Sequence, residues 1–222
     1  MKSEAVFDRR LLVHRALADE TRLAIVDALA LSDRTPTELR RLVAAPSNLL
    51  TFHLDTLQRA GLVARSKSQG DARRRYVGLT AAALPLVVPA AQPTPAMVLF
   101  VCTHNAARSQ FARALWLART GRRALSAGAR PADTVDPTAV EVAQARGLDL
   151  ATAEPCGYGA IDTAPDLVVS VCDRAAEAGL PFDAPRLHWS VADPRGGNRA
   201  AFDAAFDTIA ARMDRLVSSV RA

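Results

Sequence analysis

The spacing of apolar residues divides the chain into two parts with different periods. Over the first 80 residues, apolar positions recur every three or four residues between turn signals, which is typical of short amphipathic helices. The predicted helices cover 8–18, the segment after Asp19, the segment after Thr35, and 47–60. Two strand-like runs, 62–66 and 75–79, flank Gln69-Gly70-Asp71, so the helices are followed by a hairpin.

From Met97 onward the pattern changes to strands that alternate with helices. The predicted strands cover 97–101, 124–127, 167–171 and 186–189, and the predicted helices cover 109–120, 137–146 and 199–220. This alternation predicts the α/β class, a doubly wound parallel sheet with helices on both faces. Residues 81–96 contain four prolines among alanines and valines, which favours a stiff linker. We therefore expect an α+β domain at 1–82, a linker at 83–96 and an α/β domain at 97–222.

The composition fits a reducing, aqueous compartment. Half of the 222 residues are apolar, which is enough for two cores without disulfides. Three cysteines at wide spacing suit a cytoplasmic protein with reactive thiols better than a disulfide framework. Charged residues among the first ten positions lead us to expect no signal peptide, and prolines interrupt the longest apolar run, so we expect no membrane span.

Positive charge is concentrated in the first 80 residues. Lys and Arg outnumber Asp and Glu there by 14 to 9, whereas residues 81–222 carry 14 of each kind. The excess gathers around the predicted hairpin, where Asp71 is the one acidic residue. The basic residues of this patch are Arg59, Arg65, Lys67, Arg73, Arg74 and Arg75. Such a patch favours a nucleic-acid-binding surface, although a solvated face without a partner produces the same pattern.

The order of helix, turn, helix and basic hairpin is that of a winged helix-turn-helix. Residues 17–23 and 52–63 resemble the opening helix pair and the recognition helix of ArsR-family repressors. We expect the protein to bind a two-fold symmetric operator in double-stranded DNA as a homodimer. The residues expected in the major groove are Ser47, Asn48, Thr51 and Phe52, and those expected to contact phosphates or a minor groove are Arg73, Arg74 and Arg75. The small polar residues of this set also fit simple helix capping.

The sensor residues of the ArsR family are missing from this half of the chain. Arsenic-sensing relatives carry a cysteine pair near the third helix, and metal-sensing relatives carry clusters of His and Asp. Residues 1–80 contain no cysteine and only two histidines, His14 and His53, far apart in sequence. We expect His53 to pack inside the helix pair, and any ligand sensing to come from elsewhere.

A cysteine ends the first predicted strand of the α/β part, and an arginine comes six positions later. Residues 97–109 read Met-Val-Leu-Phe-Val-Cys-Thr-His-Asn-Ala-Ala-Arg-Ser. A loop of this length ahead of a helix directs backbone N–H groups at one point, which makes an anion cradle. Arg108 is suited to bind two oxygens of a tetrahedral oxyanion, and Cys102 in that field is expected to be a nucleophilic thiolate. A buried structural cysteine would leave this strand–loop–helix context unexplained.

Further residues of this loop fit the same chemistry. Ser109 is placed to donate a hydrogen bond to the Cys102 sulfur, and Asn105 tolerates the left-handed backbone that such a loop requires. The stretch resembles the phosphate loop of low-molecular-weight protein tyrosine phosphatases and of the related arsenate reductases, and residues 104–110 look like the reductase version. The expected oxyanion-binding loop is Thr103, His104, Asn105, Ala106 and Ala107. The implied ligand is arsenate or phosphate.

A second match to this family lies near the end of the α/β part. Asp193-Pro194 resembles the Asp-Pro pair whose aspartate protonates the leaving oxygen, which implies that Asp193 is the general acid. An Asp-Pro pair that merely starts a turn is the alternative. The phosphatases place aromatic residues after this pair to stack on a phosphotyrosine ring. Arg195-Gly196-Gly197 follows here, so we expect feeble tyrosine phosphatase activity.

The third match is Cys172, at the end of a predicted strand. Thioredoxin-coupled arsenate reductases carry a cysteine there that attacks the first one, and another cysteine seven residues later. Gly179 occupies that later position here, so the internal relay is shortened. The resemblance implies that Cys172 resolves the Cys102 adduct, with an external thiol and a merely structural Cys172 as alternatives. For Cys156 we expect a structural role.

Together these resemblances imply a fusion of an ArsR-type transcriptional regulator with a thiol-dependent arsenate reductase. Arsenate would form an adduct with Cys102 and leave as arsenite. We expect no metal and no bound cofactor, and an external thiol as reductant: thioredoxin, glutaredoxin, mycoredoxin or a low-molecular-weight thiol. Two alternatives stay open. One is a transcription factor whose phosphatase-like domain only senses an oxyanion or a thiol-reactive ligand, and the other is a low-molecular-weight protein phosphatase.

Overall fold

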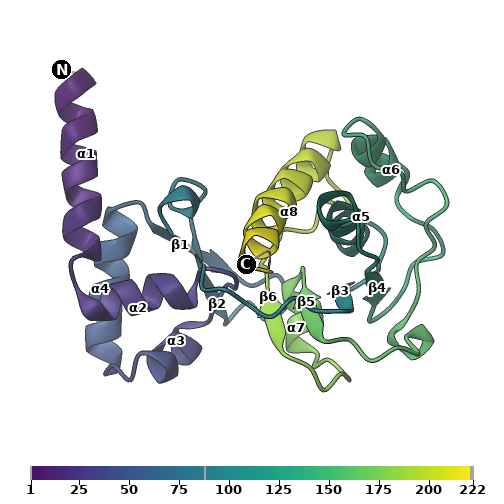
Figure 1. Ribbon diagram of the computed structural model, residues 1–222, viewed down its shortest axis with the longest axis horizontal. Coiled ribbons are helices and arrows are strands. Elements are labelled where there is room, and N and C mark those ends of the chain that lie inside the picture. The colour runs from purple at the N-terminus through teal and green to yellow at the C-terminus, as the bar shows by residue number, and fades with distance from the viewer. Residues whose placement is uncertain (1, 88, 221–222) are drawn as a thin grey trace. The chain divides into compact units, whose positions relative to one another are not determined.

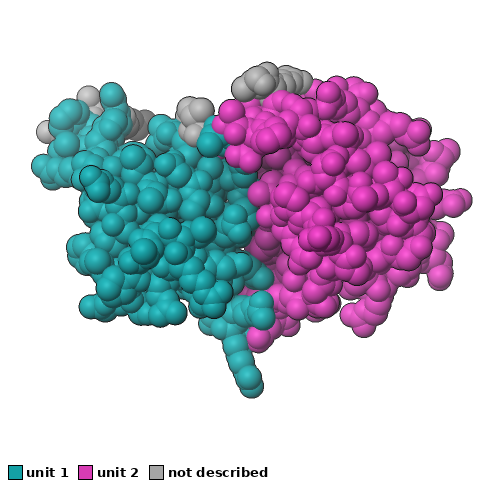
Figure 2. All heavy atoms as spheres, turned by 60° about the horizontal axis from the view of Figure 1, so that its bottom comes forward, with its two compact units in different colours: residues 1–67, 73–90 teal, residues 68–72, 91–222 magenta. Residues whose placement is uncertain are grey.

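The computed structural model describes residues 2–87 and 89–220 (Figure 1). It contains two compact units, coloured separately in Figure 2. The first comprises the residues up to Lys67 together with Arg73–Ala90, and the second comprises Ser68–Ala72 together with the chain from Ala91 onward. The domain boundaries given above stay predictions. Within the first unit, a 3-10 turn (η1, Leu84–Leu86) lies near the start of the proline-rich segment.

The first unit is helical apart from an antiparallel hairpin. Its elements are α1 (Lys2–Leu17), α2 (Glu20–Ala28), α3 (Pro36–Leu42), α4 (Ser47–Arg59), β1 (Val63–Lys67) and β2 (Arg75–Leu79). The two strands pair in register from Val63 with Leu79 to Lys67 with Arg75. The predicted winged helix-turn-helix layout is present, with α3 and α4 as the helix pair ahead of the hairpin.

Local sequence explains where these helices begin. The Asp19 carboxylate accepts a hydrogen bond from the Arg22 N–H (2.9 Å) and caps α2. Thr35 and Glu38 form the predicted capping box at the start of α3. α1 begins well before the predicted residue 8, because Lys, Glu and Ala near its start favour a helix without adding to the apolar repeat on which the prediction rested.

The hydrophobic core of the first unit connects its helices to the hairpin. Ile25, Leu39, Leu57 and Val77, from four different elements, are fully buried in it. A backbone bridge that the sequence pattern did not predict also joins the turn before α3 to β2. The Arg34 N–H donates to the Val77 carbonyl (3.0 Å), and the Arg34 carbonyl accepts from the Val77 N–H (2.8 Å). The hairpin is therefore attached to the helices on which DNA recognition would depend.

The second unit is built on a parallel sheet, and the predicted doubly wound architecture is confirmed. The strands lie in the order β4-β3-β5-β6, and all pairs are parallel. The strands are β3 (Val98–Cys102), β4 (Leu125–Gly128), β5 (Leu167–Ser170) and β6 (Arg186–His188). The helices are α5 (Arg108–Thr120), α6 (Pro137–Gln144), α7 (Asp173–Glu177) and α8 (Arg199–Val220), with a 3-10 turn η2 (Tyr158–Ala160). The sequence pattern missed α7, which is too short to show a period.

Apolar layers cover both faces of this sheet. Phe100 packs in the larger core with Trp116 of α5 and Met213 of α8, which lie on the same side of the sheet in Figure 1. Its sequence neighbours Leu99 and Val101 belong to a smaller core on the other face, because successive side chains of a strand point to opposite faces. The carboxyl ends of β3 and β5 meet at one edge between these layers, which brings Cys102 and Cys172 to the same place.

Candidate active site and DNA-binding surface

The loop between β3 and α5 is held in shape by the segment that follows β4. Three of its carbonyl groups, those of Thr103, His104 and Ala106, accept backbone hydrogen bonds of 2.8–3.0 Å from residues 130–136. Asn105 has a φ of 51°, the left-handed backbone that the prediction assigned to it. Because these carbonyls bond to the neighbouring segment, N–H groups of the loop remain available on the Cys102 side.

Gly128 allows this loop to approach the sheet, and sequence reasoning missed it. It ends β4 opposite Cys102, and a Cβ atom there would lie 2.9 Å from backbone atoms of Thr103, His104 and Asn105. Backbone atoms do not move aside as the end of a flexible side chain does, so only glycine fits. The one signal in the sequence is a glycine directly at the end of a predicted strand.

The Cys102 sulfur lies among hydrogen-bond donors. The residue is 2% exposed, and its Sγ accepts from the Asn105 N–H at 3.1 Å and lies 3.1 Å from Ser109 Oγ. Asn105 Nδ2 donates to Ser109 Oγ at 2.8 Å. Since that bond occupies an acceptor position of the hydroxyl, the Ser109 proton is left to point at the sulfur. Two donors are therefore directed at the Cys102 sulfur.

A second layer of contacts sets the orientation of Asn105. Its Oδ1 accepts from the Cys156 N–H (3.0 Å) and from Gln110 Nε2 (3.1 Å), and Gln110 is fully buried. Gln110 was not singled out in the sequence, because nothing about a glutamine in a helix reveals which groups it will meet. The Cys156 thiol donates to the Ser126 carbonyl (3.1 Å), and burial raises its pKa, so this cysteine is a poor nucleophile.

Arg108 and Asp193 form an ion pair beside the loop, although they lie far apart in sequence. Arg108 Nη2 lies 2.9 Å from Asp193 Oδ2, and Nη1 donates to the Val191 carbonyl at 2.9 Å. Asp193 Oδ1 also accepts from the Arg195 N–H (3.2 Å). Arg108 is buried, and a buried charge requires a partner of opposite charge, which the Asp193 carboxylate provides. An oxyanion in the loop would compete with Asp193 for the guanidinium.

Cys172 lies beside the same loop, next to the end of β5. Its Sγ is 3.4 Å from Thr103 Oγ1 and accepts from the Ala175 N–H at 3.4 Å, capping α7. Burial raises the pKa of the Cys172 thiol, while the Arg108 charge opposes that effect. Thr103, the residue after Cys102, thus contacts the side chain of Cys172.

Tyr158 is a further residue near both cysteines that the sequence did not reveal. Its hydroxyl is buried and has no hydrogen-bond partner in the described part of the chain. Burial raises the pKa of Tyr158, and charge on Cys172 and Cys102 raises it further. The phenol is thus a neutral donor close to the two thiols. It lies on the 3-10 turn η2, too short an element to be predicted from a pattern.

The residues predicted to read DNA lie on the exposed side of α4. Ser47, Asn48, Thr51 and Phe52 are all exposed, and 55% of the Phe52 surface is accessible, which is unusual for an aromatic residue. His53 is buried, and its Nδ1 lies 3.6 Å from the carboxylate of Asp19, the residue that caps α2. The wing arginines are likewise exposed: Arg73, Arg74 and Arg75.

Two other kinds of site are not seen in residues 2–87 and 89–220. No three His, Cys, Asp or Glu side chains come together there as a metal ion would require. No helix in these ranges is both long and apolar enough to span a bilayer.

A cysteine–arginine loop between a parallel strand and a helix, with an aspartate from a distant loop on the arginine, defines a phosphatase-like thiol active site. A family model for low molecular weight phosphotyrosine protein phosphatase matches residues 97–222, and a helix-turn-helix domain model matches residues 17–65. The first match covers more than half of the chain, which belongs to this phosphatase family. The predicted fusion of a helix-turn-helix domain with a phosphatase-like domain is confirmed.

The C-terminal part is similar to proteins named arsenate reductase. It is 32% identical over 124 residues to arsenate reductase 1 of Bacillus cereus, which covers 53% of this chain and 91% of that protein. It is 30% identical over 128 residues to an arsenate reductase of Brevibacillus brevis, covering 55% and 94%. These matches confirm the expected class of enzyme with a phosphatase-type active site.

Two solved structures are also similar to part of the chain. A structure of an arsenate reductase from Archaeoglobus fulgidus has 35% sequence identity and a TM-score of 0.49, covering 54% of this chain and 98% of that one. A tyrosine phosphatase from Erwinia amylovora has 20% identity and a TM-score of 0.50, covering 58% and 95%, and is similar in fold alone.

Proposed function

We propose that the second unit reduces arsenate to arsenite with Cys102 as nucleophile. The observation that carries this proposal is the Cys102 sulfur, which has Ser109 and the Asn105 N–H at 3.1 Å and a buried arginine in the same loop. The similarity to proteins named arsenate reductase supports arsenate over phosphate monoesters. The absence of an aromatic wall after Asp193 also disfavours phosphotyrosine as the main substrate.

The first step is attack on arsenic. The Cys102 thiolate forms a sulfur–arsenic bond, Arg108 and the N–H groups of loop 103–107 bind the oxyanion, and one oxygen leaves as water. Asp193 supplies the proton for that oxygen. Its carboxylate is held beside the loop by the ion pair with Arg108, at the position that a general acid needs.

The second step is resolution by another thiol. That thiol attacks the Cys102 sulfur, a disulfide bond forms, and the sulfur–arsenic bond breaks with its electron pair passing to arsenic. Arsenic(V) becomes arsenic(III), and two thiols are oxidised by two electrons. We favour Cys172 as the resolving thiol because it contacts Thr103 of the same loop. Thioredoxin, glutaredoxin, mycoredoxin or a low-molecular-weight thiol then reduces the protein, or resolves Cys102 directly.

The test is arsenate-dependent oxidation of each thiol donor by the purified protein, with peptide mapping by mass spectrometry after one turnover. A Cys102–Cys172 disulfide is the expected product. A mixed disulfide between Cys102 and the donor would show that the external thiol resolves the adduct, and Cys172→Ser would then stay active. A free Cys102 thiol after exposure to arsenate would reject catalysis.

We further propose that the first unit binds an operator in double-stranded DNA as a homodimer, so that one cytoplasmic protein combines transcriptional control with arsenate reduction. The helix-turn-helix match and the exposed side of α4 support this. Changing Arg73, Arg74 and Arg75 to alanine should weaken binding to all sequences and reduce the salt dependence, because those contacts release counterions. Changing Asn48 or Thr51 should alter sequence preference instead.

The control for the triple-arginine variant is a second triple variant, of Arg119, Arg122 and Arg212 to alanine. It removes the same charge from the second unit and should leave the salt slope of DNA binding unchanged. An equal loss of slope in both variants would reject the wing as the contact surface. Analytical ultracentrifugation with and without DNA checks the dimer.

A second candidate function is a transcription factor whose phosphatase-like unit only senses an oxyanion. Gly179 favours it, since the position that follows Cys172 by seven residues carries no thiol to continue a relay. In that case arsenate or phosphate would change DNA affinity while no thiol is consumed. Measuring operator binding and thiol oxidation on the same sample separates the two functions. Efficient hydrolysis of phosphotyrosine peptides would favour the third candidate, a protein phosphatase.

A further inference from the structure

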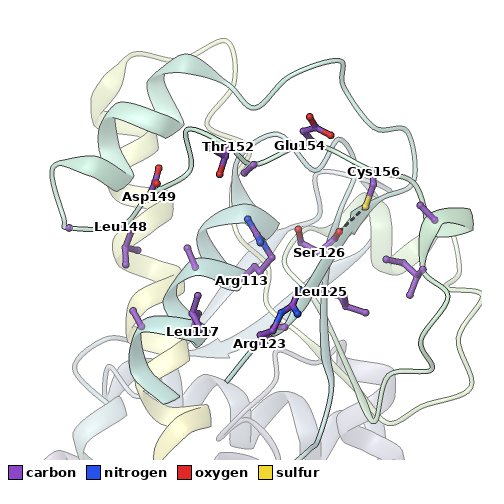
Figure 3. Close-up of a pocket in the computed structure, with 17 residues that line it drawn as sticks. Arg113, Leu117, Arg123, Leu125, Ser126, Leu148, Asp149, Thr152, Glu154 and Cys156 are labelled. Atoms are coloured by element: carbon purple, nitrogen blue, oxygen red, sulfur yellow. Dashed lines mark hydrogen bonds between the residues drawn. The ribbon is translucent and has the colours of Figure 1, made fainter. Parts of the chain in front are cut away.

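An open cavity of about 630 Å³ lies in the second unit, lined by residues outside loop 102–109 (Figure 3). It is bounded by α5, by β4 and by the chain between residues 147 and 161. Its volume is that of an ordinary small-molecule site. The walls are polar and apolar in nearly equal parts. The apolar part includes Leu117, Leu125, Leu148 and Ile161, and two arginines, Arg113 and Arg123, contribute positive charge.

Arg113 is the charge in this cavity that most requires a partner. It is half-buried, and burial lowers its pKa, which means that its charge has lost hydration. Its Nε donates to Gln110 Oε1 at 3.2 Å, a neutral acceptor. None of the ion pairs found among the described residues includes Arg113. A half-buried guanidinium without a carboxylate binds an anionic group well when one is supplied.

The remaining charges limit what kind of anion fits. Arg123 adds a second positive group at the exposed rim, whereas Asp149 and Glu154 also line the cavity and are drawn at the end away from Arg123 in Figure 3. Those two carboxylates repel a ligand with several negative charges. A ligand with one carboxylate fits this distribution of charge. Its carboxylate pairs with the arginines, and its apolar body lies along the leucines and brings no further negative charge toward Asp149 and Glu154.

Hydrogen bonds connect Arg113 to the catalytic sulfur. The Gln110 amide receives the Arg113 bond on its oxygen, and its nitrogen donates to Asn105 Oδ1 (3.1 Å). Asn105 Nδ2 then donates to Ser109 Oγ (2.8 Å), which lies 3.1 Å from Cys102 Sγ. Each amide has one oxygen and one NH₂ group, so the two amides couple Arg113 to Ser109. The Glu154 carbonyl, which accepts from Gln110 Nε2 (3.3 Å), and the Cys156 N–H, which donates to Asn105 Oδ1 (3.0 Å), also hold them in place.

We propose that this cavity binds a small monocarboxylate with an apolar body, and that the bound carboxylate weakens the thiolate of Cys102 through Gln110 and Asn105. The carboxylate competes with Gln110 for the Arg113 guanidinium. Without Arg113, the Gln110 amide is held through its nitrogen alone, which donates to Asn105 and to the Glu154 carbonyl. Asn105 Nδ2 is then fixed less firmly on Ser109, and the sulfur has weaker support from one of its two donors. The cavity is then a regulatory site separate from the oxyanion loop.

Butyrate is the probe for binding, with butylammonium as the probe of opposite charge and acetate as the probe without an apolar body. Calorimetric titration of the full-length protein should show saturable binding of butyrate, weaker binding of acetate and none of butylammonium. Arg113→Gln and Arg123→Gln should each weaken butyrate binding by about tenfold or more. Arg122→Gln, a neighbouring charge that does not line the cavity, should leave it unchanged.

Three results would overturn the binding site: no saturation by butyrate, equal binding of butylammonium, or full binding by Arg113→Gln with displacement by arsenate, which would place butyrate in the oxyanion loop. The relay is tested by alkylation of Cys102 with uncharged iodoacetamide, followed by peptide mapping. Saturating butyrate should slow that reaction by about fivefold, the lower end of typical coupling between sites. An unchanged rate would reject the relay. Neither readout needs arsenate turnover, so failure here is distinguishable from failure of the proposed reductase function.

Discussion

Cys102 and Cys172 have the same position in the fold but different surroundings. Cys102 is the last residue of β3, and Cys172 lies just after the neighbouring parallel strand β5. Both precede a helix, and both are 2% exposed. Cys102 is separated from α5 by a loop of five residues and meets donors at 3.1 Å from Asn105 and Ser109. Cys172 adjoins the five-residue α7 directly, and its contacts with Thr103 and Ala175 are both 3.4 Å.

The difference shows that burial alone does not determine whether a thiol is suited to be the nucleophile. Equal burial raises the pKa of Cys172, whereas the loop around Cys102 surrounds an equally buried sulfur with N–H and O–H groups. A nucleophile needs donors in place before the reaction, while a resolving thiol needs to react only after the adduct has formed. The predictions below test whether the loop is the cause of this difference.

Replacing each cysteine separately should have the largest effect. Cys102→Ser should reduce arsenate turnover by about 10⁴-fold or more, because the serine hydroxyl does not ionise in this loop. Cys172→Ser should abolish steady turnover if Cys172 resolves, but it should still form the Cys102–arsenic adduct once. Rapid quenching followed by intact mass spectrometry measures that adduct. If Cys172→Ser also fails to form the adduct, the two thiols do not have separate roles.

Displacing the loop should have the next largest effect. Gly128→Ala places a Cβ 2.9 Å from three backbone atoms of the loop, so the loop must shift. We expect binding of sulfate to weaken by about tenfold or more, with a loss of about 1–3 kcal/mol in the free energy of unfolding. Gly159→Ala is the matched control, because a Cβ there meets nothing within 4 Å. Equal behaviour of the two variants in calorimetry and urea unfolding would mean that the loop tolerates the methyl group.

Removing one donor at each sulfur compares the two cysteines directly. Ser109→Ala should slow iodoacetamide alkylation of Cys102 at neutral pH by about tenfold, the effect of losing a hydrogen bond to a charged group. Thr103→Val keeps the shape of the side chain but removes the hydroxyl that contacts Cys172. In the folded protein it should change the rate of Cys172 alkylation by less than about tenfold, the effect of losing a neutral hydrogen bond. Similar effects at both sites would contradict the distinction between thiolate and thiol.

Much of this arrangement was predictable because it is local in sequence. The loop residues, Arg108 and Ser109 follow Cys102 within seven positions, and the alternation of strands and helices predicts the sheet that carries them. Asp193 was predicted by resemblance alone, since its contact with Arg108 depends on the complete fold. The same dependence explains why the role of Cys172 stays a proposal.

The residues that were missed act through tertiary contacts without a sequence signature. Gly128 matters because another strand's loop comes close to it, and Gln110 matters because its amide happens to lie between Asn105 and Arg113. Tyr158 lies on a turn of three residues, which no periodic pattern reveals. The bridge between Arg34 and Val77 is likewise a contact between segments that show no strand pattern together.

The smallest expected effect concerns His104, which distinguishes the Cys102 loop from the Cys172 turn by its response to pH. Its Nδ1 lies 3.0 Å from the Arg130 carbonyl, so that nitrogen carries the proton in the neutral ring. Burial lowers the pKa of His104 below 6.5, and the Arg195 charge lowers it further. The histidine is therefore neutral at pH 7. Below pH 6.5 the unfolded chain takes up this proton before the folded one, so stability falls as the pH falls.

The same proton should strengthen oxyanion binding, because it adds positive charge to the loop. Sulfate keeps its charge between pH 7.5 and 5.5. The affinity for sulfate at pH 5.5 divided by that at pH 7.5 therefore reports the titration of groups in the protein alone. The ratio should be larger for the unchanged protein than for His104→Asn, whose amide replaces the Nδ1–H, by a few-fold at most, as for a partly solvated ion pair. Identical ratios would show that His104 does not face the bound anion, leaving the loop charge to Arg108.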